Sequence, residues 1–578
     1  MKSRFVARIP HQPSTFSDSV PLLRRSSARR NAAPLLALRQ AVAHGREKCG
    51  LVPLLVLVVL VVGLPTLAAD PELAPPTVIP QPVKMEVGEG KFTFGPKTAI
   101  VVETGTRRVG EYLAGLLRTP TGFELPIREV SSAVEPDDAV VLRIVSGKES
   151  LGPEGYELTV LADRGVLVEA PAEAGAFYAT QTLRQLLPPA VESENPTNGV
   201  TWTVPCVHVE DKPRYAWRGV MLDPGHNFLT KEYTKRYIDA MACYKMNRLH
   251  WHLTDMGWAI EIRKYPELTN LENRTPITNR WRKAYGKCTH GFYTQDEVRE
   301  IVAYAAERHV TIVPEIEMPG HATGALACYP ELACPNWPDE VVDARSYHSY
   351  RSIFCAGNEK TFAFLEDVLT EVIELFPSEL IHIGGDECSK GHWKTCPRCQ
   401  ARIKAEGLKD EEELQSYFVK RIEKFLQSKG RRLIGWTEIV EGGLAPDATV
   451  QSWLDPKHGL AAIKEGHDVV MSTHGNCYLN YLGLSMEKCY GFEPTPPGLT
   501  PDEARHVLGV EPCLWGYPQH RHDELLFPRL CAFAEVGWSP KDARDWPGFK
   551  ERLKPHGRRL DEIGINYHRD PAVWQGRK

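Results

Sequence analysis

Two adjacent carboxylates, Asp386 and Glu387, have the setting in this sequence that most favours chemistry. They follow the apolar run Leu380–Ile383, which predicts a short buried strand, and then a Gly-Gly pair that lets the backbone turn. In a parallel α/β sheet or barrel, catalytic groups collect at the ends of the strands. An Asp-Glu pair alone is most often solvated surface charge, but other acids and histidines end similar strands here. The sequence therefore predicts an enzyme.

The other residues near predicted strand ends suit the binding of a sugar. Acidic and imidazole groups follow two of the strands, as Asp255 and His321. Aromatic groups follow later strands, and an arginine lies just before the first one: Trp436, Trp453, Tyr478, Trp515 and Arg218. Aromatic rings pack against the apolar C–H faces of a pyranose, while Arg and carboxylates bind its hydroxyls. One protonated acid can then protonate the glycosidic oxygen.

Eight strands that alternate with helices must position these side chains. The strands are predicted at Gly219–Leu222, Arg248–His252, Val310–Pro314, Leu380–Ile383, Arg432–Gly435, Thr449–Trp453, Asp468–Ser472 and near Leu514. About eight β/α units over roughly 350 residues are typical of a (β/α)8 TIM barrel with loop insertions. An open doubly wound sheet is the alternative, but no Gly-rich phosphate loop supports it.

Between the predicted barrel strands, the sequence shows capping and periodicity patterns that indicate helices. Thr294 and Glu297 form a capping box before one helix, and another helix with a periodic apolar face ends at Gly430. Before the barrel, strands are predicted at Val140–Val145, Tyr156–Val160 and Gly165–Glu169, with a helix at Ala174–Leu187. This mixture predicts a small α+β domain. We expect a leader at residues 1–69, the α+β domain at 70–212 and the catalytic barrel at 213–578.

The first 69 residues read as an export signal. They carry ten Lys and Arg against two acids, followed by the apolar stretch Leu51–Leu67 and then Ala68-Ala69. The stretch is nearly long enough to anchor the chain in a membrane, so both a cleaved signal peptide and a signal anchor are open. We expect a periplasmic, extracellular or envelope-associated protein. The whole chain has a net charge of −5, so the part after this leader carries −13, which does not suit nucleic acid.

Of the 14 cysteines, 13 follow the leader. Four possible ligands just after the acidic pair, Cys388, His392, Cys396 and Cys399, are formally a zinc candidate. Disulfides or plain thiols are favoured in an oxidising compartment. The sequence does not determine the pairing. We expect no cofactor or metal in the catalytic site.

Several ordered motifs together give the chain a family resemblance over nearly all of its exported length. It resembles family 20 glycoside hydrolases, the β-N-acetylhexosaminidases. The matching motifs are IPQP at 79–82, GAFY at 175–178, WRG at 217–219, NRLHWHLTD at 247–255, PEIEMPGH at 314–321, HIGGDE at 382–387, PRL at 528–530 and AE at 534–535.

The resemblance implies substrate-assisted hydrolysis with retention of configuration. The 2-acetamido carbonyl of the substrate would attack the anomeric carbon and form an oxazolinium ion. Glu387 would be the general acid and then the general base, and Asp386 would orient the acetamide N–H. His321, supported by Asp255, would sit behind Glu387 and adjust its protonation. Tyr478 would hold the acetamide carbonyl. The walls of the pocket would be formed by Trp436, Trp453 and Trp515, and Arg218 would bind the ring hydroxyls.

The chain departs from the family pattern at three positions. His226 stands where the family usually has Arg, Asn480 where it has Asp, and Tyr517 where it has Glu. The family's Asp and Glu bind outer hydroxyls around O4 and O6, so two charge-assisted hydrogen bonds, each worth about 1.5–3 kcal/mol, would be lost. We expect altered sugar selectivity more readily than inactivity.

Three functions remain open from the sequence. The first is an exo-acting β-N-acetylhexosaminidase that removes terminal N-acetylhexosamine from a glycan. The second is a family 20 enzyme with shifted specificity, which acts on an O4- or O6-modified sugar or releases a disaccharide. Disaccharide release needs a more open pocket, and the loop 327–356 could shape that difference. The third is a catalytically silent glycan-binding homologue, against which the intact acidic pair argues. The membrane is a partner only if the leader is an uncleaved anchor.

Overall fold

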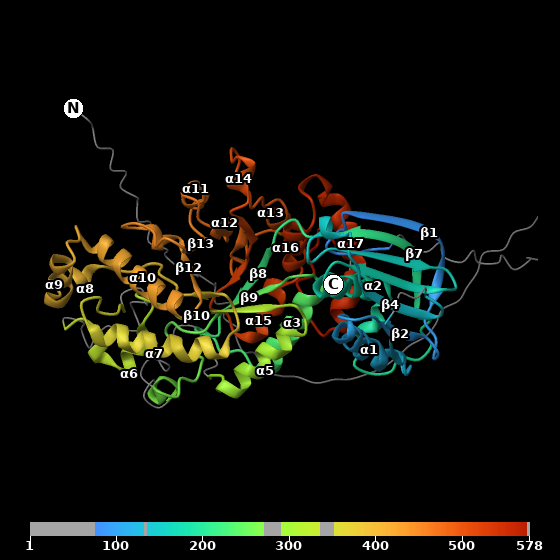
Figure 1. Ribbon diagram of the computed structural model, residues 1–578, viewed down its shortest axis with the longest axis horizontal. Coiled ribbons are helices and arrows are strands. Elements are labelled where there is room, and N and C mark those ends of the chain that lie inside the picture. The colour runs from blue at the N-terminus through green and yellow to red at the C-terminus, as the bar shows by residue number, and fades with distance from the viewer. Residues whose placement is uncertain (1–75, 132–135, 271–290, 336–351, 575–578) are drawn as a thin grey trace, which may run out of the picture. The chain divides into compact units, whose positions relative to one another are not determined.

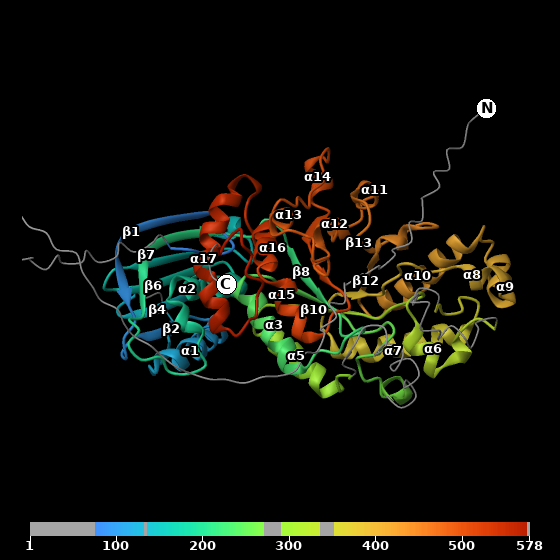
Figure 2. The same cartoon turned by 180° about the vertical axis from the view of Figure 1, so that it is seen from behind.

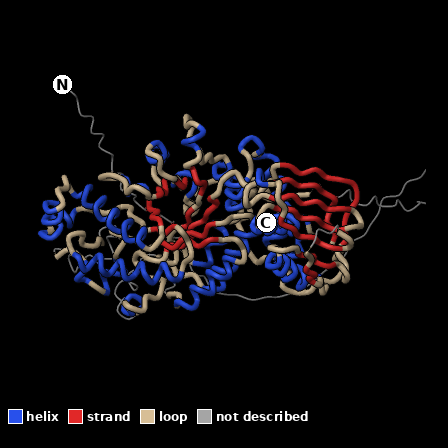
Figure 3. The backbone as a smooth tube through the Cα atoms, viewed as in Figure 1, coloured by secondary structure: helices blue, strands red, loops and turns tan. Residues whose placement is uncertain are grey.

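The computed structural model describes residues 76–131, 136–270, 291–335 and 352–574. They belong to one compact unit that begins at Glu72, and its two sheets are the red strands of Figure 3. The predicted leader lies outside the described residues. Within the described ranges, no helix is both long and apolar enough to cross a membrane.

The second sheet is a closed parallel barrel, which confirms the predicted (β/α)8 fold. Its strands are β8 (Trp217–Leu222), β9 (Arg248–His252), β10 (Thr311–Glu315), β11 (Leu380–His382), β12 (Arg432–Trp436), β13 (Thr449–Ser452), β14 (Val469–Met471), β15 (Val507–Val510) and β16 (Cys513–Leu514). Both β15 and β16 pair in parallel with β8, so together they act as the eighth strand and close the barrel. The predicted strands are confirmed to within one or two residues, apart from the last, which is split.

Helices cover the outside of the barrel (Figure 1). The larger ones are α3 (Lys231–Cys243), α5 (Gln295–Ala306), α7 (Glu359–Leu375), α10 (Glu411–Ser428), α11 (Pro456–Lys464), α15 (Gln519–Leu526), α16 (Arg529–Trp538) and α17 (Trp546–Glu562). The capping box of Thr294 and Glu297 is present at the start of α5. Because strands and helices alternate, the strands are covered on both sides, and every residue of β8 is buried.

Shorter helices lie in the βα loops. They are α6 (Thr323–Cys328) after β10, α8 (Gly391–Thr395) and α9 (Pro397–Ala405) after β11, α12 (His474–Cys477) and α13 (Met486–Tyr490) after β14, and α14 (Pro501–Ala504) before β15. Apart from α14, which lies close to the amino end of β15, these segments extend the end of the barrel at which the carboxyl termini of the strands meet, where a TIM-barrel site is expected.

The preceding α+β domain is a seven-stranded mixed sheet with the order β1-β7-β5-β6-β4-β2-β3. The strands are β1 (Lys84–Thr93), β2 (Ala99–Val102), β3 (Ile127–Glu129), β4 (Ala139–Ile144), β5 (Tyr156–Leu161), β6 (Gly165–Ala170) and β7 (Thr203–Asp211). Helices α1 (Arg107–Thr121) and α2 (Glu173–Leu186) share one apolar core with the sheet. The strands and the helix predicted here are confirmed.

Contacts from α2 join this domain to the barrel. The side chain of Gln185 donates to the carbonyl of Cys243 at the end of α3, over 2.7 Å. Arg559 of α17 donates to the carbonyls of Gln185 and Leu187 and pairs with Glu192. Figure 2 shows α17 beside α2. The contacts give the barrel a fixed support on the side away from its catalytic loops.

Candidate active site

The backbone after β11 delivers the acidic pair in a strained conformation. Gly384 and Gly385 have φ of 70° and 89°, and Glu387 itself has φ of 43°. A Cβ on Gly384 would lie 1.7 Å from Oε2 of Glu317, and one on Gly385 would lie 2.5 Å from Ile439. Glycine is therefore required here for both its conformation and its size. A left-handed Glu persists only where its surroundings hold it, as happens at functional sites.

His321 brings the predicted catalytic residues together. Its Nε2 lies 3.5 Å from Oδ2 of Asp386 and 3.6 Å from Oε2 of Glu387, while its Nδ1 lies 2.9 Å from Oδ2 of Asp255. Asp386 is only 9% exposed, whereas the side chain of Glu387 is 48% exposed. One acid is thus held inside the site, and the other can meet a substrate.

The two ionisable groups beside Glu387, Asp386 and His321, carry opposite charges when both are ionised. Burial raises the pKa of Asp386 to about 6; His321 opposes this shift, and Glu387 adds to it. Burial by itself lowers the pKa of His321, but Asp255 and Asp386 outweigh it and raise that pKa well above its usual value. His321 is therefore an imidazolium near neutral pH, and Asp386 is ionised only above about pH 6.

A network that links the first two strands supports this imidazolium. Asp223, at the end of β8, lies 2.7 Å from Nδ1 of both His226 and His252 and accepts the N–H of Gly516 over 2.8 Å. The other nitrogen of His226 lies 3.3 Å from Oδ2 of Asp255. Sequence reasoning singled out these positions as strand ends and did not join them into one network. Their separation in sequence hid the connection.

Burial disfavours the ionised form of two further acids near Asp386. Burial raises the pKa of Glu438 to about 8, and Asp386 adds to the shift. Burial, followed by Asp386 and Glu315, raises the pKa of Glu317 well above its usual value. Glu438 accepts a hydrogen bond from Nε1 of Trp453 over 2.9 Å. Burial thus works against further negative charge next to Asp386.

The four predicted aromatic residues form one connected group. Trp453 and Tyr478 are stacked, with ring centroids 5.9 Å apart, and Tyr478 lies 5.9 Å from Trp515. Trp436 lies 5.7 Å from Trp515, is 1% exposed and donates to Glu315 over 2.7 Å, so it supports the other rings. Tyr481, 45% exposed, stacks on Tyr478 and extends this surface; the sequence analysis missed it.

The three departures from the family pattern lie around the segment 513–517. His226 lies edge-on to Trp515 at 6.4 Å, and Tyr517 is two residues further along the chain. Leu479, the residue before Asn480, is joined to the same segment, because its N–H donates to the carbonyl of Cys513. Among the described residues, Oδ1 of Asn480 and Nε1 of Trp515 are buried without a hydrogen-bond partner. The three differences from the family pattern therefore lie on one side of the site.

Arg218 does not lie with the other predicted residues, and its prediction as a sugar-binding residue is wrong. Its side chain is fully buried and makes a bidentate ion pair with Glu154 of the α+β domain, at 2.8 and 3.0 Å. It also donates to the carbonyls of Tyr215 and Lys245. Arg218 is the second residue of β8, at the end of the barrel opposite the carboxylates. Its role is to join the two domains.

Arg218→Lys is therefore expected to destabilise the fold and leave substrate binding intact. Lysine keeps the charge but loses the bidentate geometry and several donors, at a cost of about 1–3 kcal/mol. Chemical denaturation would measure this loss, and KM of the folded variant would stay within about twofold of the parent. Lys212→Arg, at an exposed position six residues earlier in the chain, is the matched control. A large rise in KM with unchanged stability would contradict the structural role.

Five groups of side chains have donor atoms close enough to hold a metal ion, within the residues that the structure describes. Four of them are histidines and carboxylates of the site and barrel interior, where imidazoles lie within ion-pair distance of acids. The fifth is Cys334, Cys355, Cys396 and Cys399. Of the four residues that the sequence offered as formal zinc ligands, this group contains Cys396 and Cys399. It does not contain Cys388 and His392; its other two members, Cys334 and Cys355, come from the loop after β10.

An acid pair with an imidazolium and stacked aromatic rings, at the carboxyl ends of TIM-barrel strands, defines the class of carbohydrate-active hydrolases. Residues 215–541 match the model for the catalytic domain of glycosyl hydrolase family 20, and residues 75–212 match the model for domain 2 of that family. The chain belongs to glycosyl hydrolase family 20.

Known relatives agree with this assignment. A β-hexosaminidase of Porphyromonas gingivalis is 43% identical over 511 residues, which are 85% of this chain and 64% of that protein, slightly less than two thirds of its length. A β-hexosaminidase of Akkermansia muciniphila is 33% identical, covering 73% of this chain and 87% of that protein. The solved GH20 β-N-acetylhexosaminidase from Streptomyces coelicolor is 35% identical with a TM-score of 0.71, over 86% of this chain and 98% of that one.

Proposed function

We propose that this protein is a retaining exo-β-N-acetylhexosaminidase that removes terminal N-acetylhexosamine from glycans by substrate-assisted catalysis. The observation that carries the proposal is the arrangement of Asp386 and Glu387 around one imidazolium, His321. A buried acid and an accessible acid next to each other suit two different tasks. Similarity to proteins named β-hexosaminidase supports the substrate class.

In the first step, the acetamide carbonyl oxygen of the substrate attacks the anomeric carbon, and the bond to the leaving oxygen breaks. Glu387 donates its proton to that oxygen, which leaves as an alcohol, and a cyclic oxazolinium ion remains. Glu387, now ionised, takes a proton from water as the water attacks the anomeric carbon. The acetamide is restored and the configuration is retained. The half-exposed position of Glu387 gives it access to both the leaving group and water.

Asp386 and Tyr478 would hold the acetamide during this attack. Ionised Asp386 accepts the acetamide N–H and offsets the positive charge that develops on the ring. Tyr478, in the aromatic group next to Trp515, donates its hydroxyl to the carbonyl oxygen. The rings of Trp453 and Trp515, both partly buried, exclude water from the sugar faces.

Aryl N-acetyl-β-glucosaminide and its galacto epimer test the activity, and fluorinated acetamides test the mechanism. Each fluorine withdraws electrons from the carbonyl oxygen, so kcat is expected to fall progressively from the acetyl to the trifluoroacetyl substrate. Product analysis by NMR should show the β-anomer first. An unchanged rate across the fluorinated series, or an α-anomer as first product, would contradict substrate assistance. No cleavage of either epimer by folded protein would contradict exo-hexosaminidase activity on plain sugars.

A second candidate is activity on an O4- or O6-modified N-acetylhexosamine. The observation that favours it is the clustering of His226, Asn480 and Tyr517 around one segment of the site, with buried polar atoms of Asn480 and Trp515 left without partners among the described residues. Activity on O4- or O6-substituted substrates, compared with the plain ones, is the test. Strong cleavage of plain GlcNAc and GalNAc substrates with none of any modified sugar would eliminate this candidate.

Disaccharide release stays a further candidate within the family. The loop to which it was assigned, 327–356, lies partly outside the described residues. Product size on a chitooligosaccharide distinguishes it from release of single sugars. A silent glycan-binding role requires intact sugar binding without turnover, which the same experiment tests.

We also propose that the protein is exported, on the basis of the basic and apolar pattern of residues 1–69. The mass of the chain recovered from membrane and soluble envelope fractions distinguishes a cleaved signal peptide from an anchor.

A further inference from the structure

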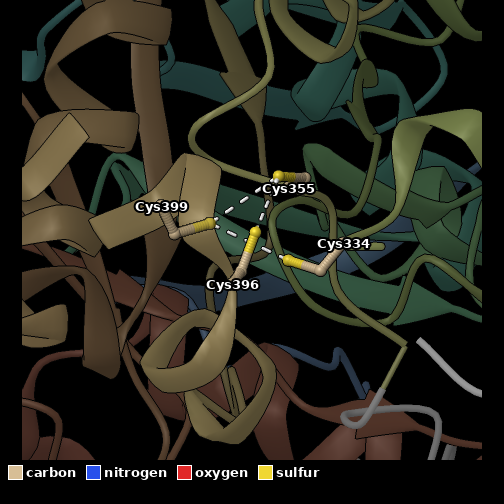
Figure 4. A group of neighbouring side chains, drawn as sticks. All are labelled: Cys334, Cys355, Cys396 and Cys399. Carbon is tan, nitrogen blue, oxygen red and sulfur yellow. Dashed lines mark hydrogen bonds between the residues drawn. The ribbon is translucent and has the colours of Figure 1, made fainter. Parts of the chain in front are cut away.

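Four buried cysteines from two separate βα loops converge outside the catalytic site (Figure 4). Cys334 and Cys355 come from the segment between β10 and α7, and Cys396 and Cys399 lie at the start of α9. Sγ of Cys355 lies 3.6 Å from that of Cys399 and 3.8 Å from that of Cys396, and Cys334 lies 3.8 Å from Cys399. All four sulfurs lie within 4.8 Å of one another.

These distances are those of a tetrahedral metal–thiolate site. With Zn–S bonds of about 2.3 Å, the corners of a tetrahedron lie about 3.8 Å apart. A disulfide joins two sulfurs at about 2.05 Å and leaves out any third one. Here Cys355 and Cys399 each approach two other sulfurs at similar distances, and all four are free thiols. A single metal ion would satisfy all four sulfurs at once.

The backbone around the cysteines is built for a close approach. Gly357, two residues after Cys355, lies against the backbone of Arg398, since a Cβ on it would be 2.2 Å from the Arg398 carbonyl carbon. Nε1 of Trp393 donates to the carbonyl of Phe354 over 2.9 Å. The two loops therefore interlock around the sulfurs. The Cys-x-x-Cys spacing at 396–399 is also the common spacing of a zinc ligand pair.

We propose that Cys334, Cys355, Cys396 and Cys399 bind one Zn²⁺ ion that ties the loop after β10 to the loop after β11. The four thiols lose their protons when the ion binds, and no oxidation takes place. Zinc with four thiolate ligands has no open position, so its role is structural. This inference does not depend on the proposed function.

The proposed zinc site would hold in place the two loops that carry the catalytic residues. On the first loop, the N–H of Phe354 donates to the carbonyl of Pro319, and the N–H of Ala322 donates to the carbonyl of Ser352, on either side of His321. On the second loop, Cys396 follows Glu387 by nine residues. The ion thus lies where it can hold His321 and the acidic pair in register, without touching the substrate.

Metal analysis of the purified full-length protein tests the proposal. We expect about one zinc per chain in the parent, less than about one tenth in Cys355→Ser and in Cys399→Ser, and an unchanged content in Cys388→Ser. Cys388 is the matched control, because it is a buried cysteine of the same loop outside the cluster. Equal zinc in all four proteins would place the metal elsewhere and overturn the proposal.

A second measurement remains informative if the serine variants do not fold. X-ray absorption at the zinc edge of the parent protein should show four sulfur neighbours at about 2.3 Å. Fewer sulfurs, or nitrogen and oxygen neighbours, would overturn the assignment. A metal-free protein would also overturn it, either with four reactive thiols or with a mass showing two disulfides. Removal of the metal by a chelator should lower Tm, since the ion binds only the folded site.

Discussion

Glu387→Gln is expected to lower kcat on N-acetyl-β-hexosaminides by about 10²–10⁴-fold, the usual contribution of a general acid–base group. Glutamine has the same shape but can neither give a proton to the leaving oxygen nor take one from water. The loss should therefore depend on the leaving group: it is largest for a sugar or alkyl aglycone and smaller for an acidic phenol, which departs without protonation. Steady-state kinetics on both substrate types measures this difference.

Glu379→Gln is the control for that experiment. Glu379 directly precedes β11, at the opposite end of the same strand, and its side chain is 70% exposed. It should keep the activity of the parent on both substrates. Equal losses for Glu387→Gln on good and poor leaving groups would show that Glu387 does not protonate the aglycone. KM should change little, because in the proposed mechanism Glu387 acts on the leaving oxygen and on water, while other residues hold the sugar.

Asp386→Asn is expected to lower kcat by about 10²–10³-fold and, at the same time, to stabilise the protein. An amide cannot offset the positive charge of the oxazolinium ion, and it presents a donor where the acetamide N–H needs an acceptor. In the parent, activity that requires ionised Asp386 should fall as the pH drops through about 6. The variant should lack this fall. Rate profiles from pH 4 to pH 8 for both proteins measure it.

The stability change has a definite sign and pH window. The pKa of Asp386 is raised from 3.8 to about 6 in the folded protein, so its ionised form is less favourable there than in the unfolded chain. Its contribution to stability is fully present below about pH 4 and is lost as the pH rises through about 6. Asparagine removes this loss and should add on the order of 1–3 kcal/mol at pH 7.5.

Denaturation at two pH values checks this effect. The variant should be more stable than the parent at pH 7.5 and nearly equal to it at pH 4. Asp367→Asn, a partly exposed acid on α7 far from the acidic pair in sequence, is a control that should show no such gain. Lower stability of Asp386→Asn at pH 7.5 would mean that its contact with His321 outweighs the burial of its charge.

Most of the fold follows from local sequence signals. The strands read as short apolar runs because parallel strands are buried on both faces, and the helices read from capping boxes and apolar periodicity. The last strand was predicted least well, since Glu511 and Pro512 divide it into β15 and β16. The residues at strand ends could be named in advance, because a closed parallel barrel brings those ends to one rim.

The sequence by itself determined the acidic pair, the Gly-Gly turn before it and four aromatic residues of the site, since most of them lie at the end of a strand or directly after it. Only the tertiary structure decided which distant residues meet. It joined Asp223, His226 and Asp255, buried Arg218 against Glu154 of the other domain, and replaced Cys388 and His392 by Cys334 and Cys355 in the cysteine cluster. The physical reason is that such contacts depend on barrel closure and loop packing, and local propensity carries no information about either.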